Sequence, residues 1–228
     1  GVKKIRLTGG EPLLRRGLED LIQMLSKHPV EIAMTTNGLL FGGRGKSLRK
    51  AGLDRVTFSL DSLDPKVFEQ ITNTSGEKLD SILNAIDEAI ECDLGQVRIN
   101  SVIRRGINEQ DIDRLIEQFE HLPVSLRFIE FMDVGNHNRW RYNNVVPSSE
   151  IHNYLKKRMN LIPIDSTHRG EVAKRWMIEG KKGFEIGFIS SVSQPFCGDC
   201  TRARISAEGR IFTCLFASKG TDLKSIIR

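Results

Sequence analysis

The last part of the chain carries three cysteines whose types and spacing suit a soft metal. Cys197 and Cys200 form a CxxC pair, and Cys214 follows a short turn around Gly209, which predicts a hairpin that returns a third thiol to the pair. A structural zinc site takes four nitrogen or sulfur ligands, and no His or further Cys lies close by in the sequence. Three thiolates instead favour an iron–sulfur cluster with one iron free for another ligand.

Two arginines adjoin this pair and indicate that the ligand is anionic. Arg202 and Arg204 follow the CxxC pair directly, and guanidinium groups bind anionic oxygens through paired hydrogen bonds. Two other interpretations of the cysteines stay open: a zinc site completed by a distant ligand, and free thiols. The fourth cysteine, Cys92, is isolated, so a disulfide scaffold is not indicated and a reducing compartment fits better.

The elements that position these residues alternate between strand-like and helix-like patterns. Strands are predicted at residues 3–8, 31–36, 55–60, 96–103 and 124–132, and helices at 13–26, 47–51, 79–92 and 109–121. This order predicts an α/β fold with a parallel sheet, open or curled into a barrel. The pattern changes near residue 145, which divides the prediction into domains 1–145 and 146–228. The second part is predicted to hold a helix at 149–159, a strand at 184–190 and a hairpin of 204–206 with 210–213.

Polar side chains recur at alternate positions near the carboxyl ends of several predicted strands. They are Arg6 and Thr8, then Thr57, Ser59 and Asp61, then Arg98 and Asn100, and last Glu130 and Met132. Alternate residues of a strand share one face, and ligands of parallel α/β sheets bind at the carboxyl ends of the strands. The pattern favours a lined cavity over a series of ordinary half-exposed strands.

Two glycine-rich segments differ in what they indicate. Gly9-Gly10-Glu11-Pro12 follows the first strand and is typical of a strand-to-helix turn in which backbone amides can approach a ligand. Residues 42–45 also contain three glycines, but they lack the Walker lysine spacing and follow no strand. We therefore interpret 42–45 as a loop.

Composition restricts the partners further. The 228 residues, 39% of them hydrophobic, can bury a sizeable core, and the formal net charge of +5 favours an anionic partner. The arginines are dispersed, without a Lys/Arg tract, which argues against a dedicated nucleic-acid surface. No apolar run is long enough to span a membrane, and no secretory leader is visible. The chain begins at Gly1 on a strand-like segment and ends in a helix-like run, so we expect both ends to be cut.

Five motifs now stand in order along the chain and resemble those of one family. They are RLTGGEP at 6–12, TTNG at 35–38, SLD at 59–61, RFIEFM at 127–132 and FCGDCTRAR at 196–204. Together they closely resemble the GTP 3′,8-cyclase family of radical S-adenosylmethionine enzymes, over essentially the whole chain. The first motif alone would indicate only the superfamily.

The resemblance implies a fold and a reaction. The fold would be a partial (β/α)6 barrel, here lacking its first strand, followed by a small carboxyl-terminal region with antiparallel strands. The family uses S-adenosylmethionine and two [4Fe–4S] clusters to convert GTP to (8S)-3′,8-cyclo-7,8-dihydroguanosine 5′-triphosphate, a lyase reaction that begins molybdenum cofactor biosynthesis. A cyclic pyranopterin monophosphate synthase would use the product.

The resemblance also assigns residues. Cys197, Cys200 and Cys214 would hold the carboxyl-terminal [4Fe–4S] cluster, whose open iron binds guanine. Gly10, Ser59 and Met132 would contact S-adenosylmethionine. The residues that would bind GTP are Arg6, Thr35, Arg98, Arg202, Ala203 and Arg204, with Asn100 and Arg127 as further candidates. Many relatives carry Lys where this chain has Arg98. No catalytic side chain is assigned.

Two departures from the family pattern lead to a further expectation. The CxxxCxxC motif that builds the radical-generating cluster is absent, Cys92 cannot replace it, and the family's tail ending in two glycines is also absent. We therefore expect this chain alone to be inactive, and 5′-deoxyadenosine formation by it would contradict that. A cytoplasmic location is expected, or the mitochondrial matrix for a eukaryotic protein, and the sequence leaves a homodimer open.

Three alternatives stay open. One is another radical S-adenosylmethionine enzyme with an auxiliary cluster, such as a peptide-modifying maturase. The second is a basic zinc module that binds nucleic acid without catalysis. The third is a naturally truncated paralogue that binds GTP or a partner protein.

Overall fold

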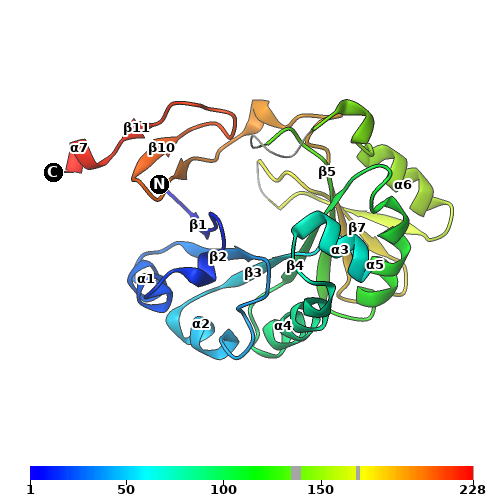
Figure 1. The fold of residues 1–228 in the computed structure, drawn as a ribbon, viewed down its shortest axis with the longest axis horizontal. Coiled ribbons are helices and arrows are strands. Elements are labelled where there is room, and N and C mark those ends of the chain that lie inside the picture. Colours follow the sequence, from blue (N-terminus) through cyan, green and yellow to red (C-terminus); the bar gives the residue numbers. More distant parts are fainter. Residues whose placement is uncertain (135–139, 168–169, 228) are drawn as a thin grey trace.

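A single eight-stranded sheet organises most of the chain. The structure is a computed structural model and describes residues 1–134, 140–167 and 170–227. The strand order is β1-β2-β3-β4-β5-β8-β7-β6 (Figure 1). The strands are β1 (Lys4–Leu7), β2 (Glu31–Thr36), β3 (Arg55–Ser59), β4 (Val97–Ile103), β5 (Val124–Glu130), β6 (Leu161–Ile164), β7 (Lys174–Ile178) and β8 (Glu185–Ile189). Strands β1–β5 and β8 pair in parallel, whereas β7 and β6 join through antiparallel pairs, so the sheet is mixed.

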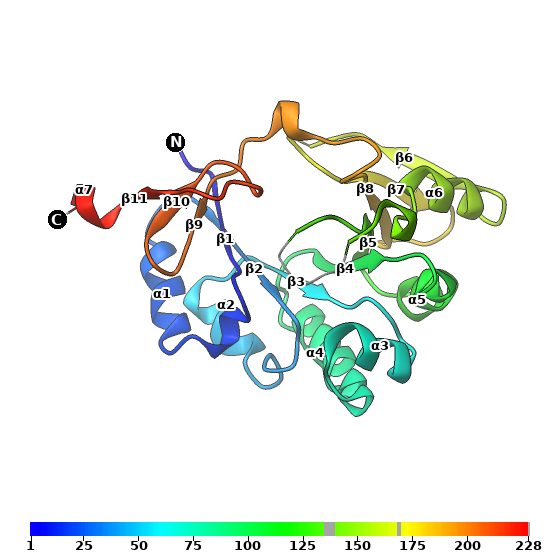
Figure 2. The same cartoon turned by 45° about the horizontal axis from the view of Figure 1, so that its top comes forward.

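Helices cover the outer face of this curved sheet, as Figures 1 and 2 show. The α-helices of this layer are α1 (Leu18–Leu25), α2 (Gly45–Ala51), α3 (Pro65–Thr72), α4 (Leu79–Glu91), α5 (Ile112–Phe119) and α6 (Ser148–Lys156). Short 3-10 turns are η1 (Pro12–Leu14), η2 (Gly76–Lys78), η3 (Glu109–Asp111), η4 (Tyr142–Asn144) and η5 (Cys197–Asp199).

Strand β4 shows how the sheet separates a core face from a polar face. Val97, Ile99 and Ile103 are almost fully buried beneath the helices, whereas Arg98 and Asn100 between them are only partly buried. Alternation places the two sets on opposite faces. Each large apolar side chain buried in this way stabilises the fold by roughly 1.5–3 kcal/mol, so the outer face fixes the register in which the polar residues are presented.

The helix predictions differ from the structure at two places. The predicted helix at 13–26 is split into η1 and α1, because Gly17 adopts a left-handed φ of 64° that a continuous helix cannot contain. Helix α3 was not predicted. Its start is nevertheless encoded: Asp64 caps it by accepting hydrogen bonds from the backbone N–H groups of Lys66 and Val67, and Pro65 occupies the first turn.

The predicted polar face was wrong at Glu130, in its last pair of residues. Arg127 pairs with Asn100 and shares its face, so Glu130, three residues further, lies on the opposite face, opposite buried Ile103. Side chains alternate along a strand, and Arg127 and Glu130 therefore could not both line the cavity from β5. Glu130 instead points into the layer beneath α6, where the Ser148 backbone N–H donates to its carboxylate.

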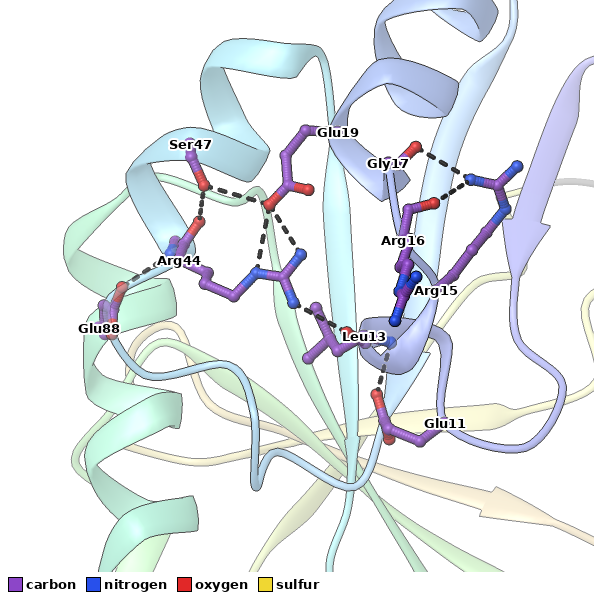
Figure 3. Close-up of polar contacts among 10 residues, drawn as sticks. Glu11, Leu13, Arg15, Arg16, Gly17, Glu19, Arg44, Ser47 and Glu88 are labelled. Atoms are coloured by element: carbon purple, nitrogen blue, oxygen red, sulfur yellow. Dashed lines mark hydrogen bonds and ion pairs between the residues drawn. The ribbon is translucent and has the colours of Figure 1, made fainter.

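The glycine-rich segment at 42–45 is a turn that binds a carboxylate of the chain itself. The backbone N–H groups of Gly43 and Gly45 donate to Glu88 of α4 at 2.8 and 2.7 Å. Nearby, the Arg44 guanidinium donates to Glu19 of α1 and to the Leu13 carbonyl (Figure 3). These contacts fix α2 against its neighbours and agree with the prediction of a loop without a phosphate site.

The carboxyl-terminal part forms a second, smaller sheet. Its order is β11-β10-β9, all antiparallel, and the predicted hairpin is confirmed. The elements are β9 (Arg204–Ile205), β10 (Arg210–Phe212), β11 (Thr221–Asp222) and α7 (Lys224–Ile227). In both views this sheet lies beside β1 and the amino terminus (Figures 1 and 2).

The α/β partial barrel followed by a small antiparallel sheet is therefore confirmed. Strands β6–β8 continue the main sheet through the β5–β8 pair, and the division at residue 145 stays a prediction. Among the described residues, no helix is both long and apolar enough to cross a membrane.

Candidate functional site

The polar face of the sheet presents two rows of side chains that cross neighbouring strands. Register places Thr35, Thr57 and Arg98 side by side, followed by Ser125. One step nearer the carboxyl ends, a second row contains Ser59, Asn100, Arg127 and Gly187. The residues of these two rows thus meet on one surface, whereas Glu130 of β5 does not join them.

Arg6 of β1 reaches across this surface to the first row. Its guanidinium donates hydrogen bonds to the Thr35 Oγ1 at 2.8 Å and to the Thr57 Oγ1 at 3.3 Å. Although Arg6 is exposed as a residue, loss of hydration at the guanidinium lowers its pKa, and the positive charges of Arg55 and Arg202 lower it further. Two neutral hydroxyls thus orient this cation without neutralising it.

Arg98 and Arg127 extend the positive charge into more buried positions. Burial, followed by repulsion from neighbouring arginines, lowers the pKa of Arg98 to about 9 and that of Arg127 to about 10. The Arg127 Nε donates to the Ser125 Oγ at 3.3 Å. Each of these guanidiniums remains the charged form at neutral pH, and their mutual repulsion would be relieved by an anion.

Several polar atoms of this surface are buried without a hydrogen-bond partner among the described residues, and they include the Arg98 Nε and the Asn100 Oδ1. An unmade hydrogen bond at a buried polar atom costs free energy. A donor and an acceptor left open beside several guanidiniums fit a polar anionic ligand that also offers a donor. A nucleoside phosphate carries both kinds of group, so the residues present fit such a ligand.

Gly187 of β8 provides the space that Arg127 occupies. A Cβ built at Gly187 would lie 3.1 Å from the Arg127 Cγ, which is closer than an ordinary carbon contact. Gly187 and Arg127 are direct neighbours in the β5–β8 register. An isolated glycine within a strand pattern signals close approach of a neighbouring group, and that signal in the sequence could have identified this position.

The carboxyl-terminal arginines face the same region from the other side. Arg202 lies close enough to Arg6 to lower its pKa, and it stacks on the Phe196 ring with 4.9 Å from Cζ to the ring centre. A buried Nη1 of Arg204 has no hydrogen-bond partner among the described residues. Ala203 between them is exposed and offers only its backbone. Arg6 and Arg202, about 200 positions apart in the sequence, thus belong to one electropositive region.

The three residues expected to contact S-adenosylmethionine lie at one edge of the sheet. Gly10 follows β1, Ser59 ends β3 and Met132 follows β5, so all three are at carboxyl ends of parallel strands. Ser59 is exposed, and a Cβ built at Gly10 would meet no atom within 4 Å. The edge therefore leaves open space where this ligand is predicted.

The cysteines supply suitable donors but are not assembled. Cys197, Cys200 and Cys214 are exposed free thiols, and hydrogen bonds from Arg202 lower the pKa of Cys200, which favours its thiolate. Among the described residues, however, no three His, Cys, Asp or Glu side chains come together closely enough to hold a metal ion. The donor chemistry fits a cluster with three thiolates, each of which would bind a different iron.

Sequence reasoning missed Arg55, which is part of the same positive region. Arg55 starts β3 and forms an ion pair with Glu31, which also pairs with Lys4 at 3.0 Å. Its charge contributes to the lowered pKa values of Arg6, Arg98 and Arg127. Position 55 shares the strand face of Thr57, and that alternation was the available signal.

A hollow of about 690 Å3 on the outer surface is a less suitable candidate. It lies between η2, α4 and α5, and Glu77, Asp80, Leu83 and Glu117 are among its lining residues. It is remote from the rows of arginines, and its carboxylates would repel an anion. The polar face of the sheet is therefore the candidate site.

Comparison with known proteins gives two family matches and a set of close relatives. Residues 1–119 match the Radical SAM superfamily, and residues 124–228 match Molybdenum Cofactor Synthesis C. A GTP 3′,8-cyclase from Xanthomonas campestris pv. campestris (strain B100) is 47% identical over 226 residues, which are 98% of this chain and 66% of the relative. One from Staphylococcus epidermidis (strain ATCC 35984) is 44% identical and covers 100% of this chain and 67% of the relative.

The chain spans about two thirds of the length of these curated relatives. Among solved structures, TYW1 with a lysine-pyruvate adduct bound aligns with a TM-score of 0.55 at 24% identity, covering 72% of this chain and 53% of that one. A domain of pyruvate-formate lyase-activating enzyme from Bacteroides vulgatus aligns with a TM-score of 0.53 at 21% identity, covering 69% and 92%. At these identities the alignments support the fold alone.

Proposed function

Since the chain belongs to the GTP 3′,8-cyclase family of the radical S-adenosylmethionine superfamily, we propose that its protein converts GTP to the 3′,8-cyclised nucleotide that begins molybdenum cofactor biosynthesis. In this proposal the polar face of the sheet holds GTP, and the carboxyl edge holds S-adenosylmethionine. A cyclic pyranopterin monophosphate synthase is proposed to act on the product, and cytoplasm is the proposed location.

The observation that carries the proposal is the group of incompletely neutralised guanidiniums on the polar face. Burial lowers the pKa values of Arg6, Arg98 and Arg127, and repulsion from neighbouring arginines lowers them further. The Arg98 Nε is also buried without a partner among the described residues. A triphosphate carries enough charge to compensate several guanidiniums, and phosphate oxygens match their paired donors. Arg202 and Arg204 would contribute from the carboxyl-terminal side.

The remaining groups would orient the nucleoside. Thr35 holds Arg6 in place through its Oγ1, and the Asn100 Oδ1 is an acceptor available to a ligand hydroxyl or amino group. The planar guanidinium of Arg98 permits two parallel hydrogen bonds to a ligand, whereas a Lys ammonium would offer a point charge.

Gly10, Ser59 and Met132 are proposed to hold S-adenosylmethionine at the carboxyl edge of the sheet. Gly10 would bind through its backbone, since open space lies where its Cβ would be. Once bound and reductively cleaved, S-adenosylmethionine supplies the radical on which the family's reaction depends. The role of these three residues is to position it beside the nucleotide.

Cys197, Cys200 and Cys214 are proposed to hold the carboxyl-terminal [4Fe–4S] cluster. Arg202 favours the thiolate of Cys200, which is the form that binds iron. Because the three thiols are exposed and free, we infer that iron binding orders them. Metal binding and local folding are commonly coupled in this way.

The test is anaerobic reconstitution of this chain with iron and sulfide, followed by iron analysis, EPR and titration with GTP. We expect about four irons per chain, as for one [4Fe–4S] cluster, and an EPR signal that GTP changes. Zinc retention without a cluster, together with no response to GTP, would reject the assignment of the cysteines.

The same experiment separates the alternatives. A peptide-modifying maturase would show a cluster signal that GTP leaves unchanged. A zinc module for nucleic acid would be colourless and would bind nucleic acid with strong salt dependence. A non-catalytic paralogue would bind GTP but make no product when the full-length protein is assayed with S-adenosylmethionine and a reductant.

A further inference from the structure

Glu130, the last residue of β5, makes an unusually complete set of contacts for a buried carboxylate. The residue is 1% exposed. Its Oε1 accepts hydrogen bonds from the Ser148 backbone N–H at 2.7 Å and the Ser193 hydroxyl at 2.5 Å. Its Oε2 accepts from the backbone N–H groups of Val192 and Ser193 at 2.8 and 2.7 Å. Both oxygens are thus engaged by two donors each.

These donors come from two segments that are distant from β5 in the sequence. Ser148 is the first residue of α6, and Pro147 before it provides no side-chain cap, so Glu130 takes the place of a capping carboxylate. Val192 and Ser193 belong to the loop that follows β8. One side chain therefore ties a strand end, a helix start and a loop together.

That loop leads directly to the first two cysteines of the proposed cluster. Ser193 is four residues before Cys197 and seven before Cys200. On the other side of the contact, Met132 is two residues after Glu130. The carboxylate therefore joins the strand end proposed to contact S-adenosylmethionine to the segment proposed to bind iron.

The loop has a second, weaker attachment beside a hollow of about 170 Å3, which is lined by residues that include His152, Trp176, Ser193 and Gln194. The Lys174 Nζ donates to the Gln194 Oε1 at 2.8 Å, between two exposed residues. The buried carboxylate is the stronger attachment, because hydrogen bonds to a charged, buried acceptor exceed those at the surface.

We propose that Glu130 is the positioning residue that anchors the loop of Cys197 and Cys200 to the carboxyl end of β5. The proposal rests on the cluster assignment made above, and it adds a residue that itself binds neither iron nor nucleotide. If this is so, iron uptake and the response to GTP both depend on the Glu130 carboxylate, which lies on the helix-covered face of the sheet.

Glu130→Gln tests this role because it keeps the shape and removes the charge. The backbone N–H groups of Ser148, Val192 and Ser193 all donate to Glu130. A Gln side chain has only one acceptor oxygen, so its NH2 group must face at least one of these N–H groups, donor against donor. Glu88→Gln is the matched control: Glu88 also binds two backbone N–H groups, of Gly43 and Gly45, but they belong to a turn beside Cys92, which is not one of the proposed cluster ligands. Both variants lose the same kind of contact.

The first readout uses metal-free protein and follows trypsin cleavage after Arg202, which is exposed. We expect E130Q to raise the cleavage rate about tenfold, because weakening the anchor raises the population in which the loop opens. E88Q should leave that rate close to wild type. The second readout is iron per chain after reconstitution, with the EPR response to GTP, both of which should fall in E130Q and persist in E88Q.

The outcomes separate the anchor from the cluster assignment. Equal cleavage of E130Q and E88Q, or full iron uptake with a wild-type response to GTP in E130Q, would overturn the positioning role. If E130Q opens the loop while even wild-type protein takes up no iron, the anchor is supported and the cluster assignment fails. Should E130Q not fold, Ser193→Ala removes one of the four donors and should produce a smaller change in the same direction.

Discussion

The polar face of the sheet and the cysteine segment differ in how far their geometry is already in place. Arg6, Arg98 and Arg127 project from strands whose register is fixed by a buried apolar face, and Thr35, Thr57 and Ser125 orient two of them. The cysteines are exposed, stand on short turns and do not gather into a metal-holding group within the described residues. The comparison teaches that the sheet preorganises charge, whereas the proposed cluster must organise its own ligands.

The cost of preorganisation differs as well. Burial lowers the pKa values of Arg98 and Arg127, and repulsion from neighbouring arginines lowers them further. A bound anion would relieve this repulsion. The exposed thiols store little electrostatic repulsion. Their arrangement around a cluster would therefore be fixed by the metal–ligand bonds themselves. Variants of the two regions should therefore affect stability and binding in different combinations.

The largest effect is expected from removing two thiols. Cys197→Ala with Cys200→Ala should abolish cluster assembly, reducing iron from about four per chain to near zero after reconstitution. The melting temperature without metal should change little, because both side chains are exposed. Iron analysis and thermal unfolding check the two parts. Cys92→Ala is the matched control and should retain iron; loss of iron in that variant would show that the wrong cysteines were assigned.

A smaller effect, of opposite sign in stability and binding, is expected at Arg98. Arg98→Met removes the charge and keeps most of the apolar length, so GTP affinity should fall roughly 10- to 100-fold, as for loss of one charged hydrogen-bonding group. Without nucleotide the melting temperature should rise by a few degrees, because repulsion with Arg6 and Arg127 is removed. Calorimetric titration and thermal unfolding measure both.

Arg49→Met, on the exposed surface of α2, is the control and should alter neither quantity appreciably, because its ion pair with Asp93 is exposed. A destabilised Arg98→Met variant that still binds GTP at wild-type affinity would contradict the idea that the sheet stores repulsion for an anion.

The pH dependence of stability provides a further test at the carboxyl end of β3. Burial raises the pKa of Asp61 to about 6, although its carboxylate accepts a hydrogen bond from the Val102 N–H at 2.8 Å. Between pH 4 and 6 the folded state keeps a proton that the unfolded chain has released, so the free energy of unfolding falls as pH rises through this window. The contribution should be roughly 1–3 kcal/mol, allowing for partial solvent access.

Asp61→Asn keeps the shape and removes this titration. Urea unfolding at intervals from pH 4 to 7 should therefore give a flatter curve for the variant than for wild type. If the free energy of unfolding changed with pH equally in the variant and in wild type, Asp61 would not contribute the expected pH dependence.

The smallest effect is expected at Gly187, where a Cβ would press on the Arg127 side chain. Gly187→Ala should displace the guanidinium and weaken GTP binding several-fold, since an ångström-scale error suffices to spoil paired hydrogen bonds. Gly42→Ala, which meets no atom within 4 Å, is the control. Unchanged affinity in Gly187→Ala, with folding intact, would show that Arg127 is not held in a required position.

Much of the architecture could be predicted because local patterns and tertiary packing agree. The alternation of Arg98 and Asn100 with buried Val97 and Ile99 predicted both the strand and its polar face. The hairpin before Cys214 followed from a glycine turn between short strands. Prediction was wrong at Gly17, because an apolar helical period does not reveal a left-handed residue that interrupts it. It was also wrong at Glu130, which lies three residues after Arg127 on β5 and therefore on the opposite face of the strand.

The site could be predicted where the type of a single residue indicates which ligand it binds. Cysteine spacing and arginines indicate ligands by type, whereas Arg55, Gly187 and the anchor at Glu130 act through neighbours on other strands and loops. Such roles depend on register across the sheet, as in the pairing of Gly187 with Arg127, and one strand read by itself does not contain that information.

The most direct test of preorganisation is calorimetric titration of metal-free protein with inorganic tripolyphosphate, at low and at moderate salt, followed by GTP before and after iron–sulfide reconstitution. We predict that tripolyphosphate binds without metal, with an affinity that falls as salt is added, and that GTP gains affinity over tripolyphosphate after reconstitution. Absence of tripolyphosphate binding to the folded, metal-free protein would contradict the account, because the sheet would then not present an anion site by itself.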